Sequence, residues 1–304
     1  MRNKGNLINY LGYLFGILSL IIIILSLTCI IRDRPVSRIR KFPFRMWAPI
    51  DWEETLRKPS TGRTRIEGEE IIGEPYKNLE VKNISGDIDI TGWKEDYFLI
   101  KYVKSGPTKE HIEELRVQVD TTENVISVKR LPELKSLIQR GSVSFDIFIP
   151  DTVKTISANS VSGHIILNQM PAGITQNLKT VSGRIKTDNS GNLQVSSISG
   201  STSFRFSGST LNVSTISGSI KGEMSDLKSG GSLELSSVSG SIHINADETL
   251  NSDISLKSVS GSISCDFPVT ISVKKRNLLE GKIGEGFIPM NIKTTSGSIK
   301  IRKL

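Results

Sequence analysis

The sequence predicts an all-β protein: a single-stranded parallel β-helix, or β-solenoid, with a right-handed coil and a capping segment, preceded by one N-terminal transmembrane helix. Three observations lead to this prediction. Ser-Gly recurs eight times inside the same ten-residue frame, aliphatic residues hold fixed positions around each copy, and one uncharged apolar run lies near the N-terminus. The inner copies lie about 17 to 22 residues apart, a spacing that suits one coil of a solenoid.

Each Ser-Gly pair is expected to mark a corner of a coil. Glycine tolerates a positive φ and the close approach of a neighbouring coil, so it suits such a corner. Hydroxyl and amide residues beside the corner, such as Asn83 and Thr180, can bond to local turns or to the next coil. The eight structural pairs are Ser85-Gly86, Ser162-Gly163, Ser182-Gly183, Ser199-Gly200, Ser217-Gly218, Ser239-Gly240, Ser260-Gly261 and Ser296-Gly297.

Three aliphatic columns are expected to stack inside the coils. They take the fourth residue before the serine, the residue directly before it and the second residue after the glycine, as in Leu235, Val238 and Ile242. Because Leu235 and Val238 are an odd number of residues apart, strict alternation along a strand would point one of them outward. We expect a bend between them that turns both inward.

The solenoid domain is expected over residues 79–304, with an N-terminal coil and cap over 79–150 and repeated coils over 151–304. Four strands and a helix without the Ser-Gly frame form the cap, which covers the open first coil. We expect these strands over 97–103, 116–119, 125–129 and 143–149, and the short helix over about 108–115. Residues 269–288 depart from the repeat, and the last copy then closes the chain.

An apolar run of about 25 residues without a charge, 7–31, is long enough to cross a bilayer. Residues 1–31 are therefore interpreted as a short tail and a single-pass membrane anchor. A cleaved signal peptide and a lipoprotein site at Cys29 are the alternatives, but no small-residue cleavage site ends the run. Basic residues after the run would place the solenoid in the cytoplasm, and the side of the membrane stays open.

A basic juxtamembrane linker is expected over residues 32–78. Its cations are attracted to anionic lipid headgroups, and its aromatic side chains suit the bilayer interface. The membrane therefore provides a partner for this basic segment, and we expect no nucleic acid. The expected membrane-surface contacts are Arg38, Arg40, Lys41, Arg45 and Trp47.

The residues that carry enzyme or metal chemistry are sparse. A nucleophilic serine needs a base within hydrogen-bond reach, yet the serine recurs in every copy and the chain has only three histidines. Asp87 and Asp89 are not repeated in later copies, so no calcium ladder is expected. With Cys29 and Cys265 as the only cysteines, we expect no disulfide framework, metal or cofactor.

These features resemble the bacterial putative-adhesin family of unknown function called toastrack. The resemblance covers most of 79–304 and rests on the repeated Ser-Gly frame, the run FDIFIP at 145–150 and the closing segment 281–299. It implies an envelope-associated β-solenoid that faces the outside of the membrane, with no catalytic residues to carry over. It also implies an association with envelope stress.

The expected function is that of a membrane-anchored, non-enzymatic module for interaction or sensing in the cell envelope. Its partner would be a protein or an envelope polymer, contacted by an outer face on which lysines share one column. A β-helix enzyme acting on polysaccharide is one alternative, and a homo-oligomeric scaffold is another. The column comprises Lys82, Lys179, Lys257 and Lys293.

Overall fold

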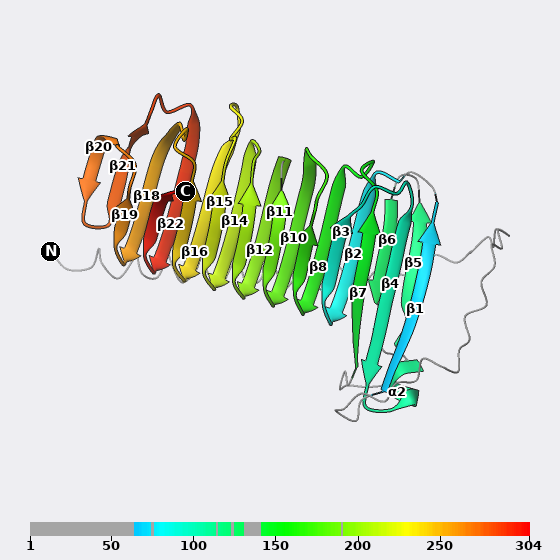
Figure 1. Cartoon of the computed structure of the whole chain (residues 1–304). Helices are drawn as coiled ribbons and strands as arrows, with labels where there is room; N and C mark the ends of the chain where they lie inside the picture. Colours follow the sequence, from blue (N-terminus) through cyan, green and yellow to red (C-terminus); the bar gives the residue numbers. More distant parts are fainter. Residues whose placement is uncertain (1–63, 74–75, 114, 123–124, 131–140, 190) are drawn as a thin grey trace.

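The computed structural model of the chain describes residues 64–73, 76–113, 115–122, 125–130, 141–189 and 191–304. These residues form an elongated β-solenoid in which strands lie side by side from one end of the molecule to the other (Figure 1). Two sheets enclose one continuous hydrophobic core. The predicted β-solenoid is thereby confirmed.

The first sheet, sheet A, has 11 strands, and the second, sheet B, has 12. The order in sheet A is β1 (Thr64–Ile72), β4 (Phe98–Gly106), β7 (Ser142–Ile149), β3 (Ile88–Gly92), β9 (Ile165–Asn168), β11 (Ile185–Asn189), β13 (Thr202–Phe206), β15 (Ile220–Met224), β17 (Ile242–Ala246), β23 (Ile299–Lys303) and β19 (Ile263–Cys265). The order in sheet B is β20 (Thr270–Lys275), β21 (Leu278–Ile283), β18 (Ser252–Ser260), β22 (Ile288–Ser296), β16 (Ser232–Ser239), β14 (Thr210–Ser217), β12 (Gly191–Ser199), β10 (Ile174–Ser182), β8 (Thr155–Ser162), β2 (Asn78–Ser85), β6 (Val125–Arg130) and β5 (Val117–Thr122).

Each repeated coil contributes a long strand to sheet B, turns at Ser-Gly and contributes a short strand to sheet A. Neighbouring coils pair in parallel with the repeats in register, so that Val195 lies beside Val213, and Ser199 beside Ser217. At the corner, the glycine amide of one coil donates to the serine carbonyl of the next, as from Gly200 to Ser217 at 3.0 Å. The Ser-Gly frame therefore continues the backbone ladder around the corner.

Two of the three expected aliphatic columns line the core. Leu235 is 1% exposed and Ile242 0% exposed, and nearly all their counterparts in the other coils are equally buried. Burying one such side chain stabilises the fold by about 1.5–3 kcal/mol relative to exposure. The stacked columns thus supply much of the stabilising energy of the solenoid.

The third expected column lies outside the core, so this part of the sequence interpretation was wrong. Val238 is 40% exposed and Val259 is 58% exposed. Alternation continues without a bend up to the serine, so the hydroxyl or amide residue before each of these positions points inward instead. Ser237 and Thr294, for example, are 5% and 4% exposed.

In several coils, these inward hydroxyl groups donate hydrogen bonds to the carbonyl groups of corner glycines. The Thr294 hydroxyl donates to the Gly240 carbonyl at 3.0 Å, and the Ser258 hydroxyl to the Gly297 carbonyl at 2.9 Å. Five of the eight corner glycines have positive φ values, such as 140° at Gly163, and a side chain at Gly163 would overlap the carbonyl of Gly86 in the adjacent coil. Both predicted roles of the corner glycine, backbone freedom and close approach, are confirmed.

The N-terminal end is closed by strands that extend both sheets. β4 and β1 run antiparallel at the edge of sheet A, and β5 runs antiparallel to β6 at the edge of sheet B. Helix α2 (Lys109–Glu113) contacts β1 and β4 and buries Ile112. β1 falls inside the range assigned to the linker, because its charged edge sequence hides the strand pattern.

The C-terminal end departs from chain order. The last coil, β22 and β23, lies between the coil of β16 and β17 and the coil of β18 and β19. The coil that ends the sequence is therefore not the coil that ends the solenoid. The coil of β18 and β19 is terminal, and the antiparallel hairpin of β20 and β21 extends sheet B beyond it.

The predicted transmembrane helix over 7–31 and most of the predicted linker lie outside the described residues. Within the part of the chain that the structure covers, no helix is both long and apolar enough to cross a bilayer.

Candidate functional site

A row of outward side chains crosses the short strands of sheet A. The third residue after each corner glycine occupies this row, and strand register places His243 of β17 between Lys221 of β15 and Lys300 of β23. Adjacent strands in a sheet lie about 4.8 Å apart. Three nitrogen-bearing side chains therefore follow one another across three neighbouring strands.

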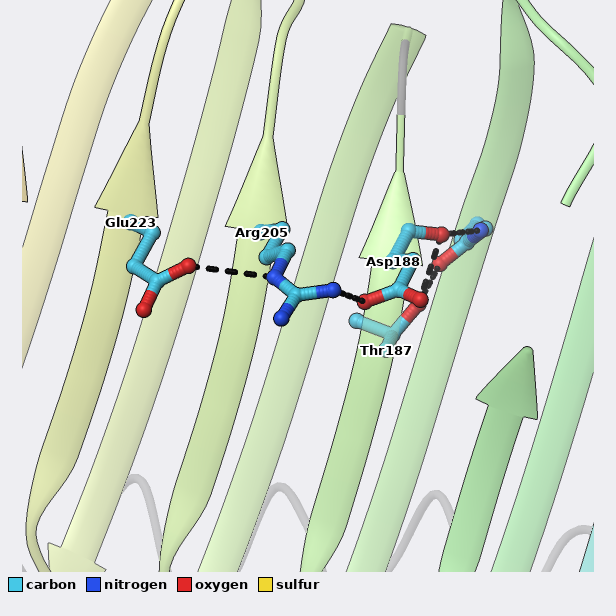
Figure 2. Close-up of polar contacts among 5 residues, drawn as sticks. Thr187, Asp188, Arg205 and Glu223 are labelled. Atoms are coloured by element: carbon cyan, nitrogen blue, oxygen red, sulfur yellow. Dashed lines mark hydrogen bonds and ion pairs between the residues drawn. The ribbon is translucent and has the colours of Figure 1, made fainter. Parts of the chain in front are cut away.

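A second outward row lies two residues further along the same strands. Here Arg205 of β13 forms ion pairs with Glu223 at 3.0 Å and with Asp188 at 3.8 Å, as Figure 2 shows. Two carboxylates thus offset the charge of this arginine. In the same row, Asn245 of β17 lies beside Arg302 of β23.

Both rows border an open groove of about 470 Å³ on the outer face of sheet A. The groove is lined by Lys186, Thr187, Asp188, Ser203, Phe204, Arg205, Lys221, Gly222, Glu223, His243, Asn245, Lys300 and Arg302. Towards β23 its charged groups are all basic. We call Lys221, His243, Lys300 and Arg302 the cation cluster.

The cation cluster carries positive charge that no described carboxylate offsets through an ion pair. Lys221, Lys300 and Arg302 have no ion pair among the described residues, in contrast to Arg205. Partial burial and the charges of Lys300, Lys221 and Arg302 hold the pKa of His243 below its ordinary value. The imidazole is therefore neutral at neutral pH, beside three permanent cations.

This arrangement suits the binding of an anion by charge and hydrogen bonding. Lysine and arginine offer N–H donors to phosphate or carboxylate oxygens, and Asn245 adds a neutral amide at the same position of the groove. No group of three or more His, Cys, Asp or Glu side chains suited to a metal ion occurs among the described residues. The groove thus combines hydrogen-bond donors with positive charge that has no ion-pair partner among the described residues.

The serines of the Ser-Gly frame lie at the corners, away from this groove. Within the described segments, no hydrogen bond joins one of their hydroxyls to a histidine. The Nδ1 atom of His164 accepts from the backbone amide of Arg184 at 3.0 Å, and His111 bonds to Thr108 at 2.7 Å beside helix α2. Both histidines thus serve local structure.

The two aspartates of the first coil lie at β3, in the N-terminal part of sheet A. The carboxylate of Asp87 accepts from the backbone amide of His164 at 2.8 Å. Burial and the nearby carboxylates of Asp87 and Asp146 raise the pKa of Asp89. Carboxylates thus gather on the outer face of sheet A at β3 and β7, and cations at β23.

The residues singled out in the sequence fall into three places. The Ser-Gly pairs form the corners, the column of Lys82, Lys179, Lys257 and Lys293 lies on the outer face of sheet B, and the linker residues lie outside the described part. The expected membrane-surface contacts thus stay a prediction for Arg38, Arg40, Lys41, Arg45 and Trp47.

The sequence analysis missed the cation cluster. Its signal was the third position after each glycine, which holds Lys186, Lys221, His243 and Lys300 in separate copies. Those copies are not all consecutive in the chain. Only the insertion of β23 beside β17 brings Lys300 and Arg302 to His243.

Comparison with known proteins identifies this architecture. The family model described as Toastrack, DUF4097, matches residues 65–302. None of the curated proteins compared with the chain matches it.

Several solved structures are similar to the chain. A "putative adhesin" of Bacteroides fragilis is 16% identical, with 78% of this chain and 96% of that chain covered and a TM-score of 0.44. A "putative cell adhesion protein" of Clostridium sporogenes is 13% identical, with 79% and 100% covered and a TM-score of 0.38. A "putative lipid binding protein" of Parabacteroides distasonis is 13% identical, with 79% and 96% covered and a TM-score of 0.34.

Proposed function

Because this chain belongs to the toastrack (DUF4097) family, we propose that it is a non-enzymatic interaction module that binds an anionic polymer of the cell envelope. The polymer lies along the groove of sheet A and contacts the cation cluster. A single N-terminal membrane span and its basic linker hold the module at the cell membrane.

One observation carries this proposal. Lys221, Lys300 and Arg302 share one groove and have no ion-pair partner among the described residues, whereas Arg205 in the same groove is paired twice. Unpaired cations that lie close together repel one another, which disfavours the cluster in the absence of a ligand. An anion at this position removes the repulsion and supplies the missing hydrogen-bond acceptors.

The shape of the groove favours a polymer over a small anion. The groove is open and crosses neighbouring strands, and the cations of its cluster come from β15 and β23, on either side of β17. A ligand with repeated negative groups engages several of them at once, which raises the overall affinity through effective concentration. Phosphodiester and carboxylate polymers both have this chemistry.

Binding of soluble polyanions to the full chain in detergent tests the proposal. Inorganic polyphosphate and polygalacturonate serve as the phosphate and carboxylate probes. We expect the Lys221→Ser/Lys300→Ser/Arg302→Ser variant to bind its preferred probe more than about tenfold more weakly at low salt, because three phosphate- or carboxylate-binding cations are lost.

The control variant Lys77→Ser/Lys154→Ser/Lys228→Ser removes the same charge from exposed positions outside the groove. It should bind as the unaltered chain does. Equal losses of affinity in the two variants would mean that net charge alone determines binding, and this would refute the site. Shortening of either polymer during incubation would refute the non-enzymatic part of the proposal, and shortening of polygalacturonate would favour a β-helix enzyme acting on polysaccharide.

A further inference from the structure

A row of aliphatic side chains runs along the outer face of sheet B beside the Ser-Gly corners. The row takes the residue directly before each serine, which the sequence analysis had placed in the core. Register pairs the residues on either side of these positions, such as Ser197 with Thr215 and Ser199 with Ser217, and so aligns the row across eight neighbouring strands. The outer aliphatic row comprises Ile84, Val161, Val181, Ile198, Ile216, Val238, Thr295 and Val259, with Thr295 as its one polar member.

The row is solvent-accessible, and its exposure is largest at the C-terminal end. Val238 is 40% exposed and Val259 58% exposed, while the earlier members are half-buried. Eight strands spaced by about 4.8 Å give a row roughly 34 Å long. An apolar row of this length on the outer surface indicates a contact with an apolar or amphipathic partner.

A second row, two residues before the first, carries the lysines of sheet B. Lys257 and Lys293 are paired in register. Leu278 of the hairpin pairs with Lys257 on one side and with Lys275 on the other, so Lys275 lies in the same row. Lys82 forms an ion pair with Glu80 at 2.8 Å. Lys179, Lys257 and Lys293 have no ion pair among the described residues, so this face presents free positive charge beside its aliphatic row.

We propose that this outer face of sheet B docks on an anionic lipid bilayer. The aliphatic row enters the boundary between headgroups and acyl chains, and the lysines beside it reach lipid phosphates with their flexible side chains. Charge complementarity commits the face to anionic lipid, because each lysine near such a surface strengthens binding about fivefold. The solenoid then lies along the membrane, and the groove of sheet A faces away from it.

The geometry supports this placement without requiring the proposed function of the groove. The two rows lie on sheet B, whereas the cation cluster lies on sheet A, and the core separates the two sheets. A failure of polymer binding therefore leaves the docking proposal intact. The two proposals are separable by variants on opposite faces.

Quenching of a fluorophore by headgroup-labelled nitroxide lipid tests the docking in the full chain, reconstituted in vesicles. The label is placed at Ser214→Cys in the lysine row, or at Ser203→Cys on the outer face of sheet A, in a Cys29→Ser/Cys265→Ala background. We expect at least twofold stronger quenching at position 214 than at position 203 in vesicles with 30% phosphatidylglycerol. In pure phosphatidylcholine the difference should vanish.

Two variants identify the groups responsible. Lys179→Ser/Lys257→Ser/Lys293→Ser should lower the ratio of docked to undocked chains more than tenfold, and Val238→Ser/Val259→Ser should lower it less. Lys221→Ser/Lys300→Ser/Arg302→Ser, on the other face, should leave docking unchanged. Circular dichroism of each variant checks that the solenoid remains folded.

Equal quenching at the two positions, or quenching that does not depend on phosphatidylglycerol, would overturn the proposal. A signal at position 214 that follows protein concentration in place of anionic lipid would also overturn it and assign the face to a second copy of the chain. Loss of docking in the sheet A variant alone would indicate that the groove of sheet A, and not sheet B, contacts the membrane.

Discussion

The inner and outer sides of the same strands differ in how strictly the repeat is kept. Inside, each coil presents an aliphatic residue four positions before the serine, as at Val195, Val213 and Leu235, and these are at most 1% exposed. Outside, the third position after the glycine changes from Asp89 to Lys221 between coils. The inner side is constrained by stacking, while the outer side is free to vary in charge.

This difference shows where function can reside in a solenoid. A change inside one coil affects the coils above and below it, because each coil buries its apolar surface on its neighbours. A change outside affects only solvent and ligands. Side chains such as Lys300 and Arg302 can therefore form a binding site at little cost to the fold.

The largest effect is expected at the glycine corner, the most constrained part of the inner side. We expect Gly163→Ala to destabilise the fold by about 3 kcal/mol or more, because the new methyl group overlaps the Gly86 carbonyl and the φ of 140° is strained for alanine. Urea unfolding followed by circular dichroism measures the change.

Gly173→Ala separates the two causes. Gly173 also has a positive φ, of 75°, but nothing lies within 4 Å of an added Cβ. Backbone strain alone should cost about 1 kcal/mol there. Equal losses at positions 163 and 173 would mean that coil-to-coil contact at the corner is not the limiting constraint.

A second contrast, of comparable size, is expected within one strand. Leu235→Ala should cost about 2–5 kcal/mol because it leaves a cavity in the core, whereas Val238→Ala should change stability by less than about 0.5 kcal/mol. Leu235 is 1% exposed and Val238 40% exposed. A large loss of stability in Val238→Ala would indicate that the outer aliphatic row is part of the core, as the sequence first suggested.

The smallest expected effect is a pH dependence on the outer side. The groups facing His243 are Lys221 and Glu223 from β15 and Lys300 and Arg302 from β23. Its pKa lies below the ordinary value, so the free chain loses stability as the pH falls through the unfolded-state value of about 6.5. A bound polyanion favours the protonated imidazole, and polyanion affinity should therefore rise over the same interval.

His243→Gln should remove this rise in affinity and leave the affinity at pH 8 nearly unchanged. Calorimetry in two buffers of different ionisation enthalpy measures the proton uptake that accompanies binding. Binding without proton uptake at pH 6 would show that the imidazole does not face the polymer.

The repeated frame allowed much of the fold to be predicted from the sequence. The Ser-Gly corners, the columns of Leu235 and Ile242 and the strands of the cap follow from local pattern and turn chemistry. Val238 was misplaced because a valine indicates burial by its type, while the alternation of the strand decides its direction. The hydroxyl of Ser237 takes the inward place because it bonds to the Gly218 carbonyl at 3.3 Å.

The position of the last coil could not be predicted in the same way. The frame around Ser296 is equally compatible with a place at the end of the solenoid or between two earlier coils, since every coil offers the same parallel ladder. After the hairpin of β20 and β21, the chain runs back past β18, and β22 pairs with both β16 and β18. The cation cluster depends on this order and was missed for that reason.

Lysine footprinting tests the central claim, that the cation cluster holds an anionic polymer, most directly. The full chain is acetylated with and without polyphosphate, and the modified lysines are identified by mass spectrometry. We predict that polyphosphate protects Lys221 and Lys300, while Lys77, Lys154 and Lys228 react equally in both conditions. Unchanged reactivity at Lys221 and Lys300, or uniform protection of all five lysines, would contradict the claim.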